Sequence, residues 1–248
     1  MRLACHLALV VLLFGAVSGA AAASQALAEA DERYDAGGLD NIRASLALYE
    51  KARTAEPERY EVLWKGARAH RDYANRAKQK GLSDWEAICK DQGKIAMKLA
   101  EPAMALAPGK VEGHYYYGLS VGIYSDGVSI FTALSEGLKG KTQNSFEKAY
   151  TLDKSYKRGG PILSLARFWT VLPWPMQDKK KALQYFREFE KGGYLQTSAE
   201  GQVYFGELLI KLGGQDNKAE ARRWLQAAAQ SPEPYFADWA ERLLAKLK

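Results

Sequence analysis

Apolar and aromatic residues recur at intervals of three and four positions along almost the whole chain. This spacing places them on one face of an α-helix, because a helix completes a turn about every 3.6 residues. No run of alternating, β-branched residues between turn signals indicates a strand. The pattern therefore predicts an all-α fold.

One short pattern occurs four times with the spacing +4, +3 and +5, and it ends on Pro in three of the four copies. The copies are Ser45, Tyr49, Ala52 and Pro57; Ala96, Ala100, Ala103 and Pro108; Thr142, Phe146, Ala149 and Lys154; and Glu220, Trp224, Ala227 and Pro232. Small residues let two antiparallel helices approach, an aromatic ring fills the space between them, and Pro ends the helix. This is the pattern of the second helix of a tetratricopeptide repeat.

The first helices of these repeats are less regular. They are expected around Trp64, Tyr117, Leu163 and Phe205. The last segment, Pro234–Lys248, carries apolar residues at helical intervals and is expected to cap the final repeat, whose stacking face would otherwise be exposed.

The repeats are not evenly spaced along the chain. Pro57 and Pro108 are farther apart than the roughly 34 residues of one repeat, which predicts insertions about Tyr73–Asp91 and Leu119–Lys141. Insertions lie on one side of a helical-repeat solenoid and often carry the binding function. Residues 24–248 are predicted to form a single tetratricopeptide-like solenoid with insertions and a C-terminal capping helix.

The N-terminal segment differs from the rest. It contains one charge, Arg2, then an apolar run from Leu7 to Phe14 and small residues from Gly15 to Ala23. This order is typical of a secretory signal peptide, residues 1–23, cleaved after Ala22 or Ala23. A retained anchor is the alternative, since Leu3–Ala23 is just long enough to span a bilayer.

The chain has two cysteines, Cys5 and Cys89. Cleavage would remove Cys5, so no disulfide is expected within the mature chain. Cys89 is expected to be a buried structural thiol, with pairing between chains as the alternative. The residues from Gly19 to Ser24 contain no cysteine that would mark a lipoprotein, so a stable membrane anchor is not expected.

Charge and motifs exclude several classes of function. The formal net charge is +6, with the two signs interspersed. The densest basic run, Lys179–Lys181, fits a solvated helix start, with an anion or headgroup site as the alternative. Nucleic acid is therefore not expected as a partner. The segment Ser135–Thr142 ends like a phosphate-binding loop but lacks its first glycine and a preceding strand, so nucleotide binding is not predicted.

The residues that usually carry catalysis show no recognisable arrangement. His70, His114 and Cys89 lack metal-ligand spacing, and no G-x-S-x-G elbow is present. Neither catalytic residues, a metal nor a cofactor is predicted, and the protein is expected not to be an enzyme. A hydrolase hidden in a helical fold, acting through Tyr or His residues near Tyr115, stays as an alternative.

Aromatic residues give the clearest candidates for a binding site. Tyr115, Tyr116 and Tyr117 surround one helix, and Tyr124 and Phe131 follow. One interpretation is dense core packing, and the other is an aromatic-lined groove for a small organic or hydrophobic ligand. The glycines of the insertion 122–131 suit an element that moves or packs closely against another backbone.

A block in the C-terminal half carries a family resemblance. It consists of Gly159-Gly160-Pro161, Arg167, Leu172-Pro173-Trp174-Pro175, Asp178, Lys181 and Ala182. This block resembles the T component of tetratricopeptide-associated TRAP transporters, over roughly Glu29 to Asp238. The resemblance implies a periplasmic repeat protein that docks the substrate-binding protein of an ATP-independent uptake system, and it leaves a homo-oligomer such as a trimer open.

Three residues of this region join the candidates. Trp174 lies between two prolines that must break the helix, so it is presented on a rigid turn or else seals two helix pairs. Arg167 is a ligand contact, or else an ion pair or a cap on helix-end carbonyls. The full set of ligand or partner candidates is Tyr116, Tyr117, Tyr124, Phe131, Arg167, Trp169 and Trp174.

The function expected from these observations is that of a non-catalytic, periplasmic accessory protein of a TRAP-type uptake system. The alternative is a general periplasmic repeat scaffold that binds a peptide or a helix through its concave surface.

Overall fold

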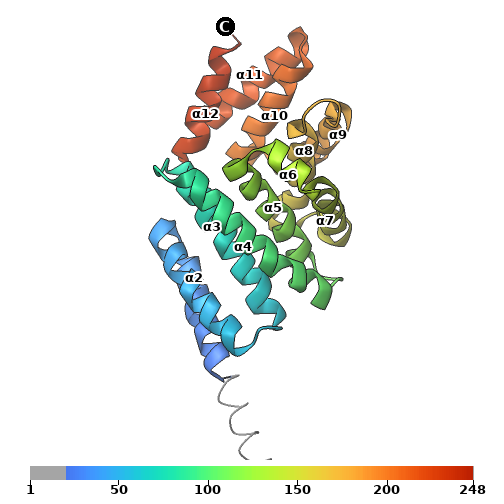
Figure 1. Cartoon of the computed structure of the whole chain (residues 1–248). Coiled ribbons are helices and arrows are strands. Elements are labelled where there is room, and N and C mark those ends of the chain that lie inside the picture. The colour runs from blue at the N-terminus through green and yellow to red at the C-terminus, as the bar shows by residue number, and fades with distance from the viewer. Residues whose placement is uncertain (1–20, 248) are drawn as a thin grey trace, which may run out of the picture. The chain divides into compact units, whose positions relative to one another are not determined.

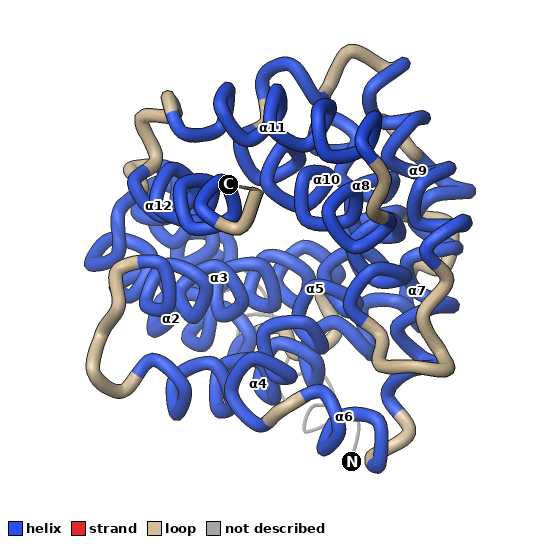
Figure 2. Tube along the Cα trace, turned by 90° about the horizontal axis from the view of Figure 1, so that it is seen from above, coloured by secondary structure: helices blue, strands red, loops and turns tan. Residues whose placement is uncertain are grey.

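The computed structural model describes residues 21–247, which form helices joined by loops and turns and contain no strand (Figures 1 and 2). After a helix over residues 21–35, the order is α2 (Gly38–Ala55), α3 (Tyr60–Gln79), α4 (Trp85–Leu106), α5 (Val111–Val128), α6 (Ile130–Ser135), α7 (Leu138–Asp153), α8 (Tyr156–Val171), α9 (Lys179–Lys191), the 3-10 helix η1 (Leu195–Thr197), α10 (Ala199–Leu212), α11 (Gln215–Ala229) and α12 (Pro234–Ala245). The predicted all-α, helical-repeat fold is confirmed.

The helices gather into two compact units. Unit 1 ends at Leu138, and unit 2 runs from Lys139 to Lys248. First and second helices of the repeats alternate along the chain. The first helices are 21–35, α3 and α5 in unit 1 and α8, α10 and α12 in unit 2, and α3 contacts α5 as α10 contacts α12. The interpretation of residues 24–248 as a single domain stays a prediction.

The predicted signal peptide lies almost entirely outside the described residues. Its last residues, 21–23, begin the helix over 21–35, in which Ala23 is fully buried. Ala26, Leu27 and Ala30 of this helix pack against α2 and α3. The two cleavage positions stay predictions. Among the described helices, none has the length and apolar character needed to cross a membrane.

The repeated second-helix pattern marks buried positions in three of its copies. Ser45, Tyr49 and Ala52 are at most 2% exposed, as Ala96, Ala100 and Ala103 are fully buried. The third copy, in α7, is buried as well.

The fourth copy of the second-helix pattern was predicted one residue too early. Ala227 is exposed, whereas Ala221, Leu225 and Ala228 of α11 are fully buried. These three residues keep the +4, +3 spacing, so the helix buries the row one position later than the pattern centred on Trp224 indicated.

The predicted insertions are mostly longer helices. The extra residues about 73–91 extend α3 and α4, which are 20 and 22 residues long. The glycine-containing segment 122–131 forms the end of α5 and the start of α6. It packs closely against another backbone, as one of its two interpretations required. A Cβ atom on Gly127 would lie 2.3 Å from the backbone nitrogen of Lys90 in α4.

The Gly-Gly-Pro block in unit 2 is a backbone turn. Lys157, Arg158 and Gly159 all have positive φ angles, and regular helix follows from Gly160. Gly159 also lies against the ring of Tyr194, where a Cβ atom would come within 2.5 Å. Glycine is required at this position by both the φ angle and the space.

Candidate functional site

The first helices of unit 1 carry a row of stacked side chains. The guanidinium carbon of Arg68 lies 3.8 Å from the ring centroid of Tyr34 and 5.2 Å from that of Trp64. Trp64 in turn stacks on Tyr116, with ring centroids 5.9 Å apart and planes 11° apart. We call these four residues the arginine–aromatic row. It joins the helix over 21–35 to α3 and α5.

Arg68 is held by a buried polar relay. Its Nη2 donates to the hydroxyl of Tyr49 at 3.2 Å, and that hydroxyl donates to Asp31 Oδ1 at 2.7 Å. The same carboxylate lies 3.7 Å from Arg68 Nη2 and also accepts from Lys65. Because Arg68 is only 8% exposed, this carboxylate compensates a charge that water cannot reach.

Tyr34 is fixed from its hydroxyl end. The hydroxyl donates to Asp72, which also accepts from Arg71 Nη1 at 2.8 Å. Burial, followed by the charge of Asp72 and this hydrogen bond, raises the pKa of Tyr34 above its ordinary value.

The outer edge of the row remains open to solvent. Tyr34, Trp64 and the neighbouring Lys65 are only partly buried, whereas Arg68 and Tyr116 are buried. Trp, Tyr and Arg are the residue types most enriched where binding energy concentrates in interfaces. An exposed aromatic edge over a rigid, charge-compensated base is therefore suited to holding a protein partner.

Unit 2 repeats this construction with other residues. The guanidinium carbon of Arg167 in α8 lies 4.3 Å from the ring centroid of Tyr204 in α10 and 5.4 Å from that of Trp239 in α12. Arg167 Nη1 lies 2.7 Å from Glu207 Oε2. Burial opposes ionisation of Glu207, but Arg167 and Lys211 outweigh it and hold the pKa of this carboxyl below its usual range. The ion-pair interpretation of Arg167 is confirmed.

The predicted tyrosines lie in the core. Tyr116, Tyr117 and Tyr124 are 3%, 2% and 4% exposed. The hydroxyl of Tyr124 donates to Glu136 at 2.9 Å. Core packing therefore accounts for all three, and only Tyr116 also belongs to the row. Phe131, on the short helix α6, is 69% exposed and away from this packing.

The two predicted tryptophans of unit 2 differ in environment. Trp174, between α8 and α9, is 82% exposed, so the interpretation that it seals two helix pairs is wrong. Trp169 is 8% exposed, and its indole Nε1 has no acceptor among the described residues. An unpaired buried donor costs about 1–3 kcal/mol, so it requires an explanation.

Sequence reasoning missed Tyr34, Trp64 and Arg68 as site residues. The available signal was the pair Trp64 and Arg68, which lie four positions apart and so share one face of α3. An arginine on the same face as a tryptophan, in a first helix, indicates stacking rather than a solvated charge.

The other potentially reactive side chains form contacts within the fold. The thiol of Cys89 is fully buried, donates to the carbonyl of Ala74 at 3.6 Å, and has a pKa raised by burial to about 12. The prediction of a buried structural thiol is confirmed. His70 Nδ1 lies 2.6 Å from Gln92 Oε1. Within residues 21–247, no group of three or more His, Cys, Asp or Glu side chains is placed to hold a metal ion.

Comparison with known proteins connects the chain to one family and one fold. The family model of regulator of microtubule dynamics protein 1–3 matches residues 26–158, more than half of the chain. Mouse regulator of microtubule dynamics protein 1 is 26% identical over 243 residues, which cover 87% of this chain and 70% of that protein. The crystal structure of a thermophilic TPR protein from Thermus thermophilus superposes with a TM-score of 0.60 at 17% identity, covering 91% of this chain and 98% of that one, which shows the fold.

These matches overturn the resemblance to the TRAP T component. The predicted substrate-binding partner rested on that resemblance and is wrong with it, and the general scaffold alternative keeps only its fold. The periplasmic location, which the N-terminal segment had also indicated, is wrong as well. The small ligand was expected in a groove lined by tyrosines that the structure instead places in the core. The misleading block has a physical explanation, because Gly159 is required by a positive φ angle and Pro161 follows at the start of regular helix. Such residues mark a turn and not a partner. The chain belongs to the regulator of microtubule dynamics protein 1–3 family.

Proposed function

We propose that this chain is a non-catalytic helical-repeat protein that regulates microtubule dynamics by binding tubulin through the outer edge of the arginine–aromatic row. The observation that carries the proposal is that the family match, residues 26–158, contains the whole row from Tyr34 to Tyr116. The mouse relative bears the same activity in its name.

The physical argument is preorganisation. Tyr34 and Trp64 are held by stacking on Arg68, and Arg68 is held by its relay to Asp31. Side chains that are already ordered lose little conformational entropy when a partner binds. The chain's net charge of +6 adds attraction toward an acidic surface during encounter.

The test measures co-sedimentation of the purified full chain with stabilised microtubules, and the turbidity of tubulin during assembly. We expect the wild type to co-sediment and to change the assembly rate. Trp64→Ala removes a stacked, partly exposed ring and is expected to weaken binding about tenfold or more.

Trp174→Ala is the matched control, because it deletes an exposed tryptophan outside the family match and is expected to bind like the wild type. Thermal unfolding of each variant confirms that it is folded. Failure of the wild type to bind, or equal binding by Trp64→Ala and the wild type, contradicts the proposal.

A further inference from the structure

Two ammonium groups lie close to one indole ring in unit 2. The Nζ atom of Lys181 in α9 is 4.3 Å from the ring centroid of Trp169 in α8, and that of Lys139 in α7 is 5.8 Å away. A cation over a ring is attracted by the electrons of the ring face. Both groups carry a positive charge, so an anion beside this ring would be attracted to each of them.

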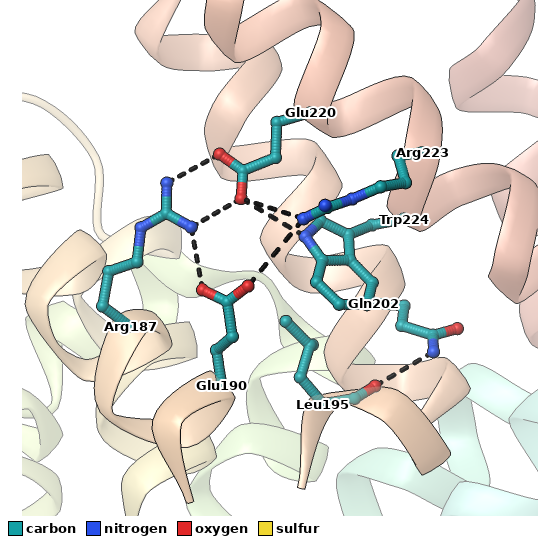
Figure 3. Close-up of polar contacts among 7 residues, drawn as sticks. All are labelled: Arg187, Glu190, Leu195, Gln202, Glu220, Arg223 and Trp224. Atoms are coloured by element: carbon teal, nitrogen blue, oxygen red, sulfur yellow. Dashed lines mark hydrogen bonds and ion pairs between the residues drawn. The ribbon is translucent and has the colours of Figure 1, made fainter. Parts of the chain in front are cut away.

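The same indole ring also carries an unused hydrogen-bond donor. Trp169 is only 8% exposed, and its Nε1–H has no acceptor in the described part of the chain. Trp224 differs in this respect, because its Nε1–H donates to Glu220 at 3.4 Å (Figure 3). A buried indole N–H usually finds a partner, so its lack here indicates a partner from outside the chain.

Neither lysine is firmly held by the protein. Lys181 Nζ lies 3.4 Å from Glu147 Oε1, and Lys139 Nζ lies 3.4 Å from Gln143 Oε1. Both distances exceed the roughly 2.7–2.9 Å of a strong charge-assisted hydrogen bond. The carboxylate of Glu147 is moreover 39% exposed and shared with Gln143 Nε2 at 3.1 Å. Both ammonium groups therefore keep most of their capacity to donate.

We propose that unit 2 binds a small oxyanion, a phosphate or a carboxylate, between Trp169 Nε1, Lys139 Nζ and Lys181 Nζ. An oxyanion has several acceptor oxygens, so one oxygen takes the indole N–H while the others accept from the two ammonium groups. A water molecule would satisfy the indole donor but would bring no negative charge to the two ammonium groups. The site is independent of the proposed binding of tubulin, since it lies outside the arginine–aromatic row of unit 1.

The test follows the indole N–H groups by ¹H–¹⁵N NMR of the full chain. The chain has six tryptophans and so six indole cross-peaks, of which Trp169→Phe removes and thereby identifies one. Inorganic phosphate and acetate are titrated separately, against sodium chloride at the same ionic strength. We expect the Trp169 cross-peak to shift and saturate with at least one of the two anions, and the anion that saturates it at lower concentration gives the class of ligand.

Variants of the lysines separate the site from general ionic effects. Lys181→Gln and Lys139→Gln are expected to raise the half-saturating anion concentration about tenfold each, because each removes a charged donor. Lys180→Gln, which removes the same charge from the exposed neighbour of Lys181, is expected to leave it unchanged. If Trp169→Phe does not fold, the cross-peak perturbed by both lysine variants and not by Lys180→Gln identifies Trp169. No saturating shift, an equal shift in chloride, or equal effects of Lys180→Gln and Lys181→Gln overturn the proposal.

Discussion

Arg68 and Tyr34, whose side chains stack with 3.8 Å between guanidinium carbon and ring centroid, are 34 positions apart in the chain (68 − 34). This separation equals the length of about one tetratricopeptide repeat, so the two residues occupy equivalent positions on successive first helices. In unit 2, Arg167, Tyr204 and Trp239 also lie on first helices and stack in the same way. The stacking is thus a feature of how first helices meet, repeated with different residues in each unit.

Replacing Arg68 tests whether the arginine–aromatic row stabilises unit 1. Arg68→Met keeps much of the buried volume but leaves the relay from Tyr49 to Asp31 without its cation. The side chain of Asp31 is 28% exposed and still pairs with Lys65 in this variant. The loss of stability should therefore be smaller than for breaking a fully buried ion pair. We expect the free energy of unfolding, measured by urea denaturation, to fall by about 2 kcal/mol.

The control for this change is Arg76→Met, an exposed position on the same helix, which is expected to change stability by less than about 0.5 kcal/mol. Equal stabilities of the two variants would show that the stacked arrangement contributes nothing.

The close contact of α4 and α5 is tested at Gly127. An added methyl group would lie 2.3 Å from the backbone nitrogen of Lys90 and 2.5 Å from the carbonyl oxygen of Glu86, so the helices must separate. We expect Gly127→Ala to lower the free energy of unfolding by about 3 kcal/mol. Gly122→Ala, on the same helix with open space around it, is expected to raise it by about 0.5–1 kcal/mol, because Ala favours helix. A stabilising Gly127→Ala would show that the helices do not approach this closely.

The sequence predicted the buried positions that depend on spacing within one helix. It did not predict the side-chain contacts between repeats. The buried row of α4, at Ala96, Ala100 and Ala103, follows from spacing alone. The fourth copy was placed one residue early because Trp224 is an aromatic residue that is itself largely buried, and spacing does not distinguish it from Leu225.

The candidate site required information that local patterns lack. Trp64 and Tyr116 stack although they belong to different repeats of unequal length, so no fixed period connects them. The tyrosines at 115–117 were conspicuous in the sequence but are buried, since α5 is covered on several sides by α3, α4 and α6.

The ion-pair network between α9 and α11 predicts a sensitivity to acid (Figure 3). Arg187 Nη2 donates to Glu220 Oε2 at 2.6 Å, and this hydrogen bond, opposed by burial, holds the pKa of Glu220 below its usual value. A depressed carboxyl pKa stabilises the fold above the unfolded value near 4.5, and this stabilisation is lost as the pH falls through the folded value. Since Arg187 is 44% exposed, the contribution is moderate.

We expect Glu220→Gln to lower the free energy of unfolding by about 1 kcal/mol at pH 7 and to match the wild type once the pH is low enough to protonate Glu220. Glu241→Gln, a change of the same type at an exposed position of α12, is expected to have no effect at either pH. A difference between Glu220→Gln and the wild type that persists after protonation would exclude the carboxylate as its cause.

His70 predicts a second pH dependence, in a different range. Burial lowers the pKa of His70 below its ordinary 6.5, although the hydrogen bond to Gln92 and the charge of Glu50 act in the opposite direction. The unfolded chain then takes up a proton at a higher pH than the folded chain does, so the free energy of unfolding decreases as the pH falls below about 6.5. Replacing His70 by Gln removes the titrating group and keeps a polar side chain beside Gln92. We expect His70→Gln to flatten the dependence between pH 7 and pH 5 measured by urea denaturation, while Glu220→Gln keeps it, because that carboxyl titrates at lower pH. An unchanged slope in His70→Gln would mean that the imidazole has the same pKa in the folded and the unfolded chain, so that burial does not shift it.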